Sequence, residues 1–253
     1  MPKMVSERKT EGGKSADHSG NGRDRVRLED RLTKGEKRKI SRLARDLVVW
    51  AEDAGRTFPW RSKTASNYER IAVEVLLQRT TAGVVAAVYN KFFNTYSDWE
   101  SLAGASDHEL HAFLKPLGLW RRRATSLKGL AEYAAANSGA FPADQADHAE
   151  IPAVGQYVSN SILLFQEGKP LPLLDVNMAR VLERFIRPRR LADIRYDPWL
   201  QAAARWLVKN DNPVGTNWAV LDFAAKVCKA RSPLCEECPV ARRCAFFKSG
   251  PLS

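Results

Sequence analysis

Long apolar segments are missing from this 253-residue sequence, and no run of 18 apolar residues occurs anywhere in it. A membrane-spanning helix is therefore not expected, because such a helix needs about 20 mostly apolar residues. The opening residues MPKMVSERKT contain no apolar stretch of the kind that a secretory signal needs, and the acidic residues Glu7, Glu11 and Asp17 argue against an organelle transit peptide. We therefore expect a cytoplasmic protein.

Strand-like alternation of apolar and polar residues is also nearly absent. Apolar residues instead recur three or four positions apart, as Ile40, Leu43 and Leu47 do, which is the spacing of one helix face. The same spacing continues in NYERIAVEVLLQ, TAGVVAAVYNKFFNTY, RRRATSLKGLAEYAA, YVSNSILLF, VNMARVLERFI and PWLQAAARWLV. The sequence therefore predicts an all-α protein.

Residues 1–33 contain few apolar side chains and are rich in glycine, serine and charges of both signs. Because such a segment cannot bury enough apolar surface to fold, we expect a disordered tail there. In the whole chain, 40 Lys and Arg residues outnumber 29 Asp and Glu residues, which gives a formal net charge of +11. A basic surplus favours a polyanionic partner such as nucleic acid, although it can also serve solubility alone.

Cysteine is scarce, and the four cysteines form one motif, C-x6-C-x2-C-x5-C, at Cys228, Cys235, Cys238 and Cys244. Four thiolates in one segment can surround a metal centre, and a cytoplasmic setting argues against disulfides. Zinc ribbons usually pair two C-x2-C units, whereas this motif has one, which favours a [4Fe–4S] cluster over zinc.

Basic residues lie inside the cysteine motif, with Lys229 and Arg231 in its first loop. A loop held in a fixed shape by a metal centre could present these side chains to phosphate groups. We therefore predict that Lys229 and Arg231 bind nucleic acid, with a simple solvated loop as the alternative.

Two short segments before the cysteines have the pattern of a phosphate site and a catalytic carboxylate. IPAVG at residues 151–155 predicts a tight turn before a helix, where the backbone N–H groups around Val154, Gly155 and Gln156 can bind a phosphate without reading sequence. Asp175 follows an apolar pair and precedes another helix. It can cap that helix, serve in catalysis, or do both.

In this order, IPAVG, Asp175 and the cysteine motif resemble the helix-hairpin-helix DNA glycosylase superfamily, which includes endonuclease III and the adenine-DNA glycosylases. The resemblance covers roughly residues 35–247. FPWR at residues 58–61 and EVLLQRT at residues 74–80 resemble the adenine glycosylases, whereas LLQRTTAG together with Tyr157 resembles the thymine-DNA mismatch glycosylases.

The resemblance implies a two-domain helix-hairpin-helix glycosylase fold with double-stranded DNA lying across the cleft between the domains. Residues 59–170 would form a six-helix barrel domain, with the helix-hairpin-helix at about residues 144–166. Residues 34–58 and 171–253 would form the domain that holds a [4Fe–4S] cluster. We expect a monomer, associated with the nucleoid if its source is prokaryotic.

The catalytic roles also come from the resemblance. Bifunctional members carry a lysine at the position of Tyr157, and its amine forms a Schiff base with the sugar, which a phenol cannot do. We therefore expect a monofunctional enzyme that leaves an abasic site intact. Asp175 would stabilise positive charge on the sugar and orient water, and Glu74, in the apolar stretch IAVEVLL, would bind the flipped base. Tyr157 would pack on the flipped base or form a hydrogen bond with it.

Other residues are expected to fill the gap that a flipped base leaves. Leu119, in LGLWRRRA, matches the wedge that enters the base stack, and we expect its neighbours Trp120 and Arg121 to contact DNA as well. Gln78 and Arg79 match the segment that meets the partner base, and an arginine can donate two hydrogen bonds to guanine. We expect the run Arg121, Arg122 and Arg123 to contact phosphates, with a solvated charged face as the alternative.

The predicted substrate is thymine, and also uracil, mispaired with guanine as G·T or G·U. Adenine opposite 8-oxoguanine is the alternative that FPWR and Glu74 favour, and we expect thymine instead partly because no further domain follows the cysteines. A non-catalytic iron–sulfur DNA-binding protein also stays open. Ala153 occupies a position where the hairpin usually has glycine, and it would be strained if φ is positive there.

Overall fold

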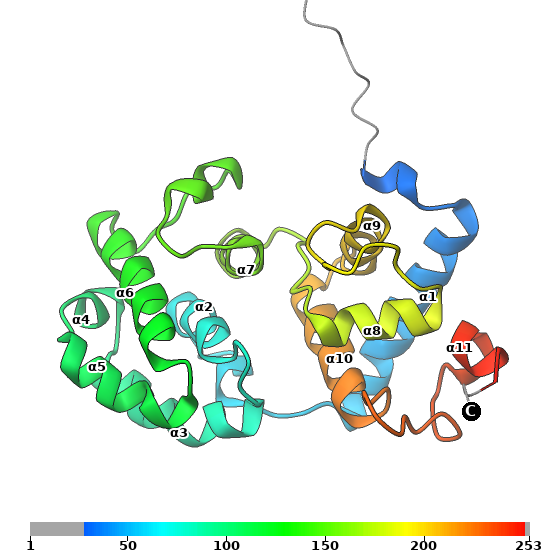
Figure 1. Cartoon of the computed structure of the whole chain (residues 1–253), viewed down its shortest axis with the longest axis horizontal. Coiled ribbons are helices and arrows are strands. Elements are labelled where there is room, and N and C mark those ends of the chain that lie inside the picture. The colour runs from blue at the N-terminus through cyan, green and yellow to red at the C-terminus, as the bar shows by residue number, and fades with distance from the viewer. Residues whose placement is uncertain (1–27, 251–253) are drawn as a thin grey trace, which may run out of the picture.

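Residues 28–250 are described by the computed structural model in Figure 1, and helices are the only regular elements in that range. The α-helices are α1 (Lys34–Ala54), α2 (Asn67–Leu76), α3 (Ala82–Thr95), α4 (Trp99–Ala103), α5 (Asp107–Leu114), α6 (Trp120–Ala136), α7 (Gln156–Glu167), α8 (Val176–Phe185), α9 (Pro198–Leu207), α10 (Pro213–Lys226) and α11 (Ala245–Lys248). Short 3₁₀ turns are η1 (Leu28–Arg31), η2 (Pro59–Arg61), η3 (Lys115–Leu117), η4 (Ala146–Glu150) and η5 (Ala241–Arg243). The all-α prediction is confirmed. Within residues 28–250, no helix combines the length and the apolar composition that crossing a membrane requires.

The helices pack around two separate apolar cores. Six helices, α2 to α7, enclose the first core, and α1 packs with α8, α9 and α10 around the second. Figure 1 shows α2 to α6 gathered at one end of the molecule and α1, α8, α9, α10 and α11 at the other, with α7 between them. A fold with a six-helix domain and a second helical domain was expected, and this arrangement agrees with it.

The exact domain boundaries stay a prediction that the two cores support. Side chains of the first core run from Trp60 to Phe165, within the predicted range 59–170, but Leu173 also belongs to this core. The neighbouring Leu174 packs in the second core. The chain therefore crosses from one core to the other immediately before Asp175.

The predicted disordered tail is partly wrong. Residues 1–27 lie outside the described part of the chain, but residues 28–33 have a defined structure. Leu28 starts the turn η1, and Leu32 is 6% exposed and packs in the second core. Thr33 then caps α1 in a reciprocal capping box with Glu36, so an apolar residue directly before the cap anchors the helix start. The highly charged surroundings concealed this signal in the sequence.

Helix α2 carries a glutamate into the first core. Its start is fixed by Ser66 and Glu69, whose side chains each accept a hydrogen bond from the other residue's backbone N–H. The six residues Ile71–Leu76 are all buried, because α2 packs against both α6 and α7. Glu74 therefore lies in an apolar environment, because its neighbours on α2 are buried as well.

An ion-pair network joins the chain before α2 to α10. Asp222 is 1% exposed and accepts hydrogen bonds from Arg56 Nε at 2.6 Å and from Arg61 Nη1 and Nη2 at 2.7 and 3.0 Å. Burial opposes ionisation of this carboxyl, but the hydrogen bonds and charge of Arg61 and Arg56 hold its pKa below the usual range. The network fixes the Arg61 guanidinium at the boundary between the two cores.

Candidate active site

A cavity open to solvent lies where residues of the two cores meet. Its walls come from η2, α2, the loop after α2, the start of α6, α7, α8 and α10. Six residues that the sequence predicts for the site line it together: Glu74, Gln78, Arg79, Leu119, Tyr157 and Asp175. Residues separated by 101 positions in the sequence thus share one cavity.

Glu74 and Tyr157 form one hydrogen-bonded unit in this cavity. The Tyr157 hydroxyl donates to Glu74 Oε2 at 2.7 Å, and the Glu74 side chain is almost fully buried. Burial raises the pKa of Glu74 to about 7, against the opposing effects of the Tyr157 hydrogen bond and the Arg61 charge. Burial, together with the Glu74 and Asp175 charges, also raises the pKa of Tyr157, so its phenol stays protonated and donates.

The raised pKa of Glu74 leads to a prediction about stability. Burial in the folded protein disfavours the ionised Glu74 carboxylate, so ionisation lowers the free energy of unfolding. This loss is small below pH 4.5, grows as the pH rises toward 7 and then reaches about 3 kcal/mol. Glu74→Gln keeps an acceptor for Tyr157 and removes the ionisation. We expect its free energy of unfolding, relative to the wild type, to rise by up to about 3 kcal/mol between pH 5 and pH 8. Denaturant unfolding at both pH values measures this, and a difference independent of pH would contradict the raised pKa.

Asp175 caps α8 and faces the cavity at the same time. Its Oδ1 accepts from the backbone N–H groups of Asn177 and Met178, both at 2.9 Å, and its Oδ2 accepts from Asn177 Nδ2 at 2.5 Å. The positive end of the helix dipole also favours a carboxylate at this position. The two roles that the sequence left open, cap and candidate catalytic carboxylate, are therefore geometrically compatible.

Two nitrogen donors in the cavity wall were missed by the sequence reasoning. Arg61 Nε and Trp218 Nε1 are buried atoms without a hydrogen-bond partner in the described structure, and both residues line the cavity. The Arg61 guanidinium lies between Phe58 and Trp218, at 5.1 and 5.2 Å from their ring centroids. FPWR could have indicated Arg61, but no local motif marks Trp218 in α10.

The loops at the cavity mouth hold the predicted wedge residues outward. Leu119 is 52% exposed at the start of α6, and Gln78 and Arg79 are exposed after α2. Leu119 and Arg79 both have positive φ, 47° and 54°, which is the left-handed region that side chains other than glycine rarely adopt. Each residue therefore occupies a strained loop tip.

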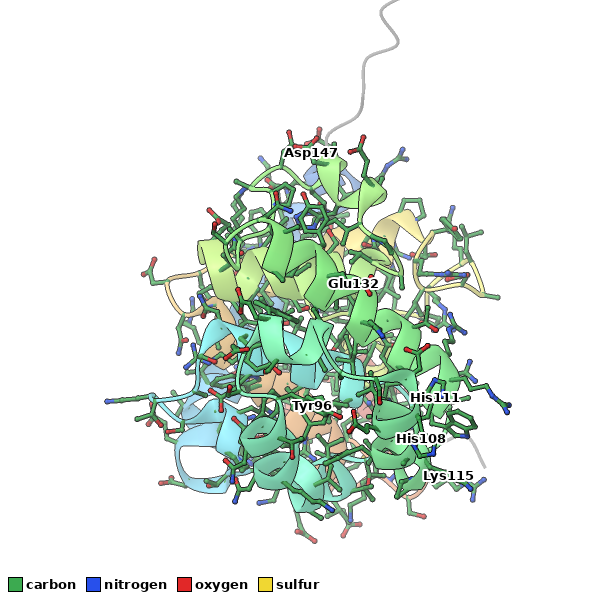
Figure 2. All side chains as sticks on the ribbon, turned by 90° about the vertical axis from the view of Figure 1, so that its left-hand side faces the viewer. Tyr96, His108, His111, Lys115, Glu132 and Asp147 are labelled. Carbon is green, nitrogen blue, oxygen red and sulfur yellow. The ribbon has the colours of Figure 1, made fainter. Side chains whose placement is uncertain are left out.

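Trp120 and Arg121 do not line the cavity. Trp120 is half-buried and packs edge-on against His111, with ring centroids 4.6 Å apart, while the Arg121 guanidinium lies 4.3 Å from the Trp120 ring centroid. Figure 2 shows His108, His111 and Lys115 gathered at one corner of the outer face. DNA contact by Trp120 and Arg121 stays a prediction.

The expectation for Arg123 is wrong. We predicted a phosphate contact, but Arg123 is 4% exposed and its guanidinium donates to backbone carbonyls and to one hydroxyl inside the protein. Arg121 and Arg122 are exposed, as a phosphate contact requires. Arg123 faces inward because it lies one helical turn before the buried Leu127.

The hairpin turn has the strain that its sequence predicts. Ala153 has φ of +62°, and Gly155 caps α7 with an ordinary φ of −89°. Gly155 and Gln156 are exposed and Val154 is half-buried, and none of them lines the cavity, so their contact with DNA stays a prediction. The Gln156 side chain exchanges two hydrogen bonds with Gln201 of α9, at 3.0 and 3.2 Å, and so links the hairpin helix to the second core.

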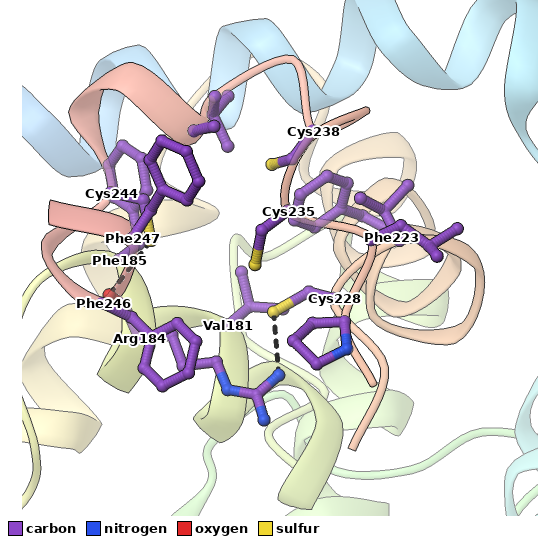
Figure 3. A pocket seen from close by; sticks show the side chains of 15 residues that line it. Val181, Arg184, Phe185, Phe223, Cys228, Cys235, Cys238, Cys244, Phe246 and Phe247 are labelled. Carbon is purple, nitrogen blue, oxygen red and sulfur yellow. Dashed lines mark hydrogen bonds between the residues drawn. The ribbon is translucent and has the colours of Figure 1, made fainter. Parts of the chain in front are cut away.

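The four cysteines line a second cavity, shown in Figure 3. Its other walls are largely apolar and include Val181, Phe185, Phe223, Phe246 and Phe247. Four soft sulfur ligands around an apolar space suit a [4Fe–4S] cluster. The donor set therefore fits this cofactor.

Two arginines of α8 hold the first cysteine loop. Arg184 Nη1 donates to Cys228 Sγ at 3.5 Å and to the Lys229 carbonyl at 2.6 Å, and Arg180 Nε donates to the Cys228 carbonyl at 2.9 Å. Lys229 and Arg231 are themselves exposed in this loop, away from the first cavity. Their contact with DNA stays a prediction.

Comparisons with known proteins agree with this geometry. Residues 72–193 match the family described as HhH-GPD superfamily base excision DNA repair protein, and residues 228–244 match the iron–sulfur binding domain of endonuclease III. A thymine-DNA glycosylase of Aeropyrum pernix is 35% identical over 219 residues, which are 85% of this chain and 98% of that protein. A thymine/uracil-DNA glycosylase of Pyrobaculum aerophilum is 38% identical over 212 residues, 81% of this chain and 91% of that protein.

A solved structure of a thermostable thymine-DNA glycosylase superposes with a TM-score of 0.75 at 29% sequence identity, over 84% of this chain and 98% of the other. The four cysteines at residues 228–244 form the [4Fe–4S] binding site of the matched iron–sulfur domain. Sequence and structure therefore agree that this chain belongs to the HhH-GPD superfamily and is a DNA glycosylase of base excision repair with an endonuclease III-type [4Fe–4S] domain.

Proposed function

We propose that this glycosylase is monofunctional and excises thymine or uracil mispaired with guanine in double-stranded DNA. The observation that carries the proposal is the composition of the cavity: Asp175, Glu74 and Tyr157 line it, and no lysine does among the described residues. Without an amine near the sugar, the protein has no nucleophile that could form a Schiff base. Hydrolysis by water with the help of a carboxylate is the remaining route to base excision.

The unpartnered donors in the wall suit a pyrimidine with two carbonyl groups. Thymine and uracil each present two carbonyl acceptors on either side of one N–H group. Arg61 Nε and Trp218 Nε1 can donate to such acceptors, and the Glu74 carboxylate can accept from the N–H group.

The chemistry assigned to each residue follows from its surroundings. Breaking the N-glycosidic bond builds positive charge on the sugar, which the Asp175 carboxylate stabilises while it orients the attacking water. Negative charge moves onto the leaving base, where the Arg61 and Trp218 donors stabilise it. Tyr157 fixes Glu74 through its hydrogen bond. The bound [4Fe–4S] cluster would tie four cysteines together and hold the shape of their loop.

The relatives support the same substrates, since two proteins of 35% and 38% identity are a thymine-DNA glycosylase and a thymine/uracil-DNA glycosylase. Labelled duplexes carrying G·T, G·U, A·8-oxoG or A·T, each divided into alkali-treated and untreated halves, test the proposal under single-turnover conditions. We expect strand cleavage of G·T and G·U only after alkali. Cleavage without alkali would refute the monofunctional mechanism, and processing of A·8-oxoG alone would make adenine the substrate.

A further inference from the structure

Arg123 uses every hydrogen-bond donor that it has, on the end of α2 and on the two loops that follow α2 and precede α6. Its Nε donates to the Val75 carbonyl at 3.4 Å. Its Nη1 donates to the carbonyls of Leu117, at 3.1 Å, and Gly118, and its Nη2 donates to the Gln78 carbonyl and the Thr80 hydroxyl, both at 2.7 Å. A guanidinium has five N–H groups, and all five are engaged.

The two loops are those that carry the candidate wedge residues. In each loop, the carbonyl directly before the left-handed residue accepts a hydrogen bond from Arg123: the Gln78 carbonyl before Arg79, and the Gly118 carbonyl before Leu119. Strained conformations of this kind persist only where the surrounding structure fixes them. A single guanidinium thus touches the backbone at both strained tips.

We propose that Arg123 is a positioning residue that locks the two loops together, so that Leu119 and the pair Gln78 and Arg79 enter the DNA as one rigid unit. The inference rests on the proposed base-flipping function. Side chains that hold open a gap in a base stack must resist its closing, and loops ordered before binding lose less entropy on contact. Arg123 itself does not need to touch the DNA.

The charge state of Arg123 agrees with this role. No carboxylate of the described residues forms an ion pair with it, so its positive charge is balanced only by carbonyl and hydroxyl dipoles. A planar fork with five donors can hold four carbonyls and a hydroxyl, whereas a lysine has only three donors. Arg123→Lys therefore keeps the charge and breaks the lock.

The test compares a paired base with an unpaired one. Uracil is placed either opposite guanine or opposite an abasic analogue, where no partner base holds it in the stack, and single-turnover excision is measured. We expect Arg123→Lys to lower the excision rate on G·U on the order of 10²-fold. The fold-loss of rate on unpaired uracil should be smaller by a factor of at least about ten. Hydrogen–deuterium exchange of the free protein should rise in residues 76–82 and 116–120.

Controls separate this role from a general structural one. Arg205→Lys, a half-buried arginine on α9 outside the cavity, should leave both the rate ratio and the loop exchange unchanged. Thr80→Val provides a second test in case Arg123→Lys does not fold. It removes the hydroxyl that accepts from Arg123 and donates to the Leu117 carbonyl. It should also lower the excision rate on G·U more than the rate on unpaired uracil. Equal losses on paired and unpaired uracil, or unchanged exchange in both loops, would overturn the proposal. Failure of the wild type on every duplex would instead refute the proposed function, while the exchange measurement still tests the lock.

Discussion

Asp175→Asn is expected to lower the single-turnover rate of base excision by roughly 10²- to 10³-fold, with little change in DNA binding. The substitution removes the negative charge that stabilises the developing positive charge on the sugar. It keeps the shape of the side chain, and asparagine is as good a helix cap as aspartate. The rate is measured on G·T duplex, and binding is measured by fluorescence anisotropy with duplex that carries an uncleavable thymine analogue.

The structure also indicates how Asp175→Asn should affect the stability of the protein. Asp175 Oδ1 accepts from two backbone N–H groups, which an amide oxygen can continue to do. Its Oδ2 accepts from Asn177 Nδ2, and an amide nitrogen there would face another donor. The loss of that hydrogen bond costs about 1 kcal/mol. We therefore expect a small fall in thermal stability, too small to explain the loss of rate.

A matched control is available at another helix cap. Asp98 caps α4, accepts from the Ser101 N–H at 2.7 Å and lies outside the cavity. Asp98→Asn should show the same cap chemistry with full excision activity. If Asp175→Asn retained more than about a tenth of the wild-type rate, another group would have to carry the charge stabilisation that we assign to Asp175.

The parts of this protein that the sequence predicted well are those with local signals. The cysteine spacing, the turn before α7 and the carboxylate before α8 each lie within one short segment, and their order along the chain was enough to indicate the family, which the comparisons confirm. The cavity then brings Glu74, Tyr157 and Asp175 together as the resemblance implied.

The parts that were missed depend on contacts between distant segments. Arg61 and Asp222 are 161 positions apart, and nothing in either segment indicates that they pair. Trp218 reaches the cavity only because α10 packs beside α8 and touches α7. Arg123 was misjudged for a different reason: three adjacent arginines look like one charged surface, but the helical phase of Leu127 and Leu130 places Arg123 on the buried face.

Tyr157→Lys is expected to convert the enzyme into one with lyase activity. In the cavity, the phenol is near both Glu74 and Asp175, so a lysine at this position would bring an amine to the carboxylate that we assign to the sugar. The free amine can attack C1′ of the sugar as the bond to the base breaks, and opening of the ring C1′–O bond then gives the imine. We expect strand cleavage of G·T duplex without alkali and a protein–DNA adduct that borohydride traps, neither of which the wild type should give.

Glu74 decides how strongly this new activity depends on pH. A carboxylate beside the amine favours the charged ammonium and so raises its pKa, whereas burial lowers it. The double substitution Tyr157→Lys with Glu74→Gln removes the carboxylate, and it should therefore trap more adduct at neutral pH than Tyr157→Lys alone. Tyr157→Phe serves as the control, since it removes the hydroxyl bonded to Glu74 without adding an amine. An adduct with the wild type would mean that another amine reaches the sugar. If neither lysine variant gave an adduct, the side chain at position 157 would not reach the sugar.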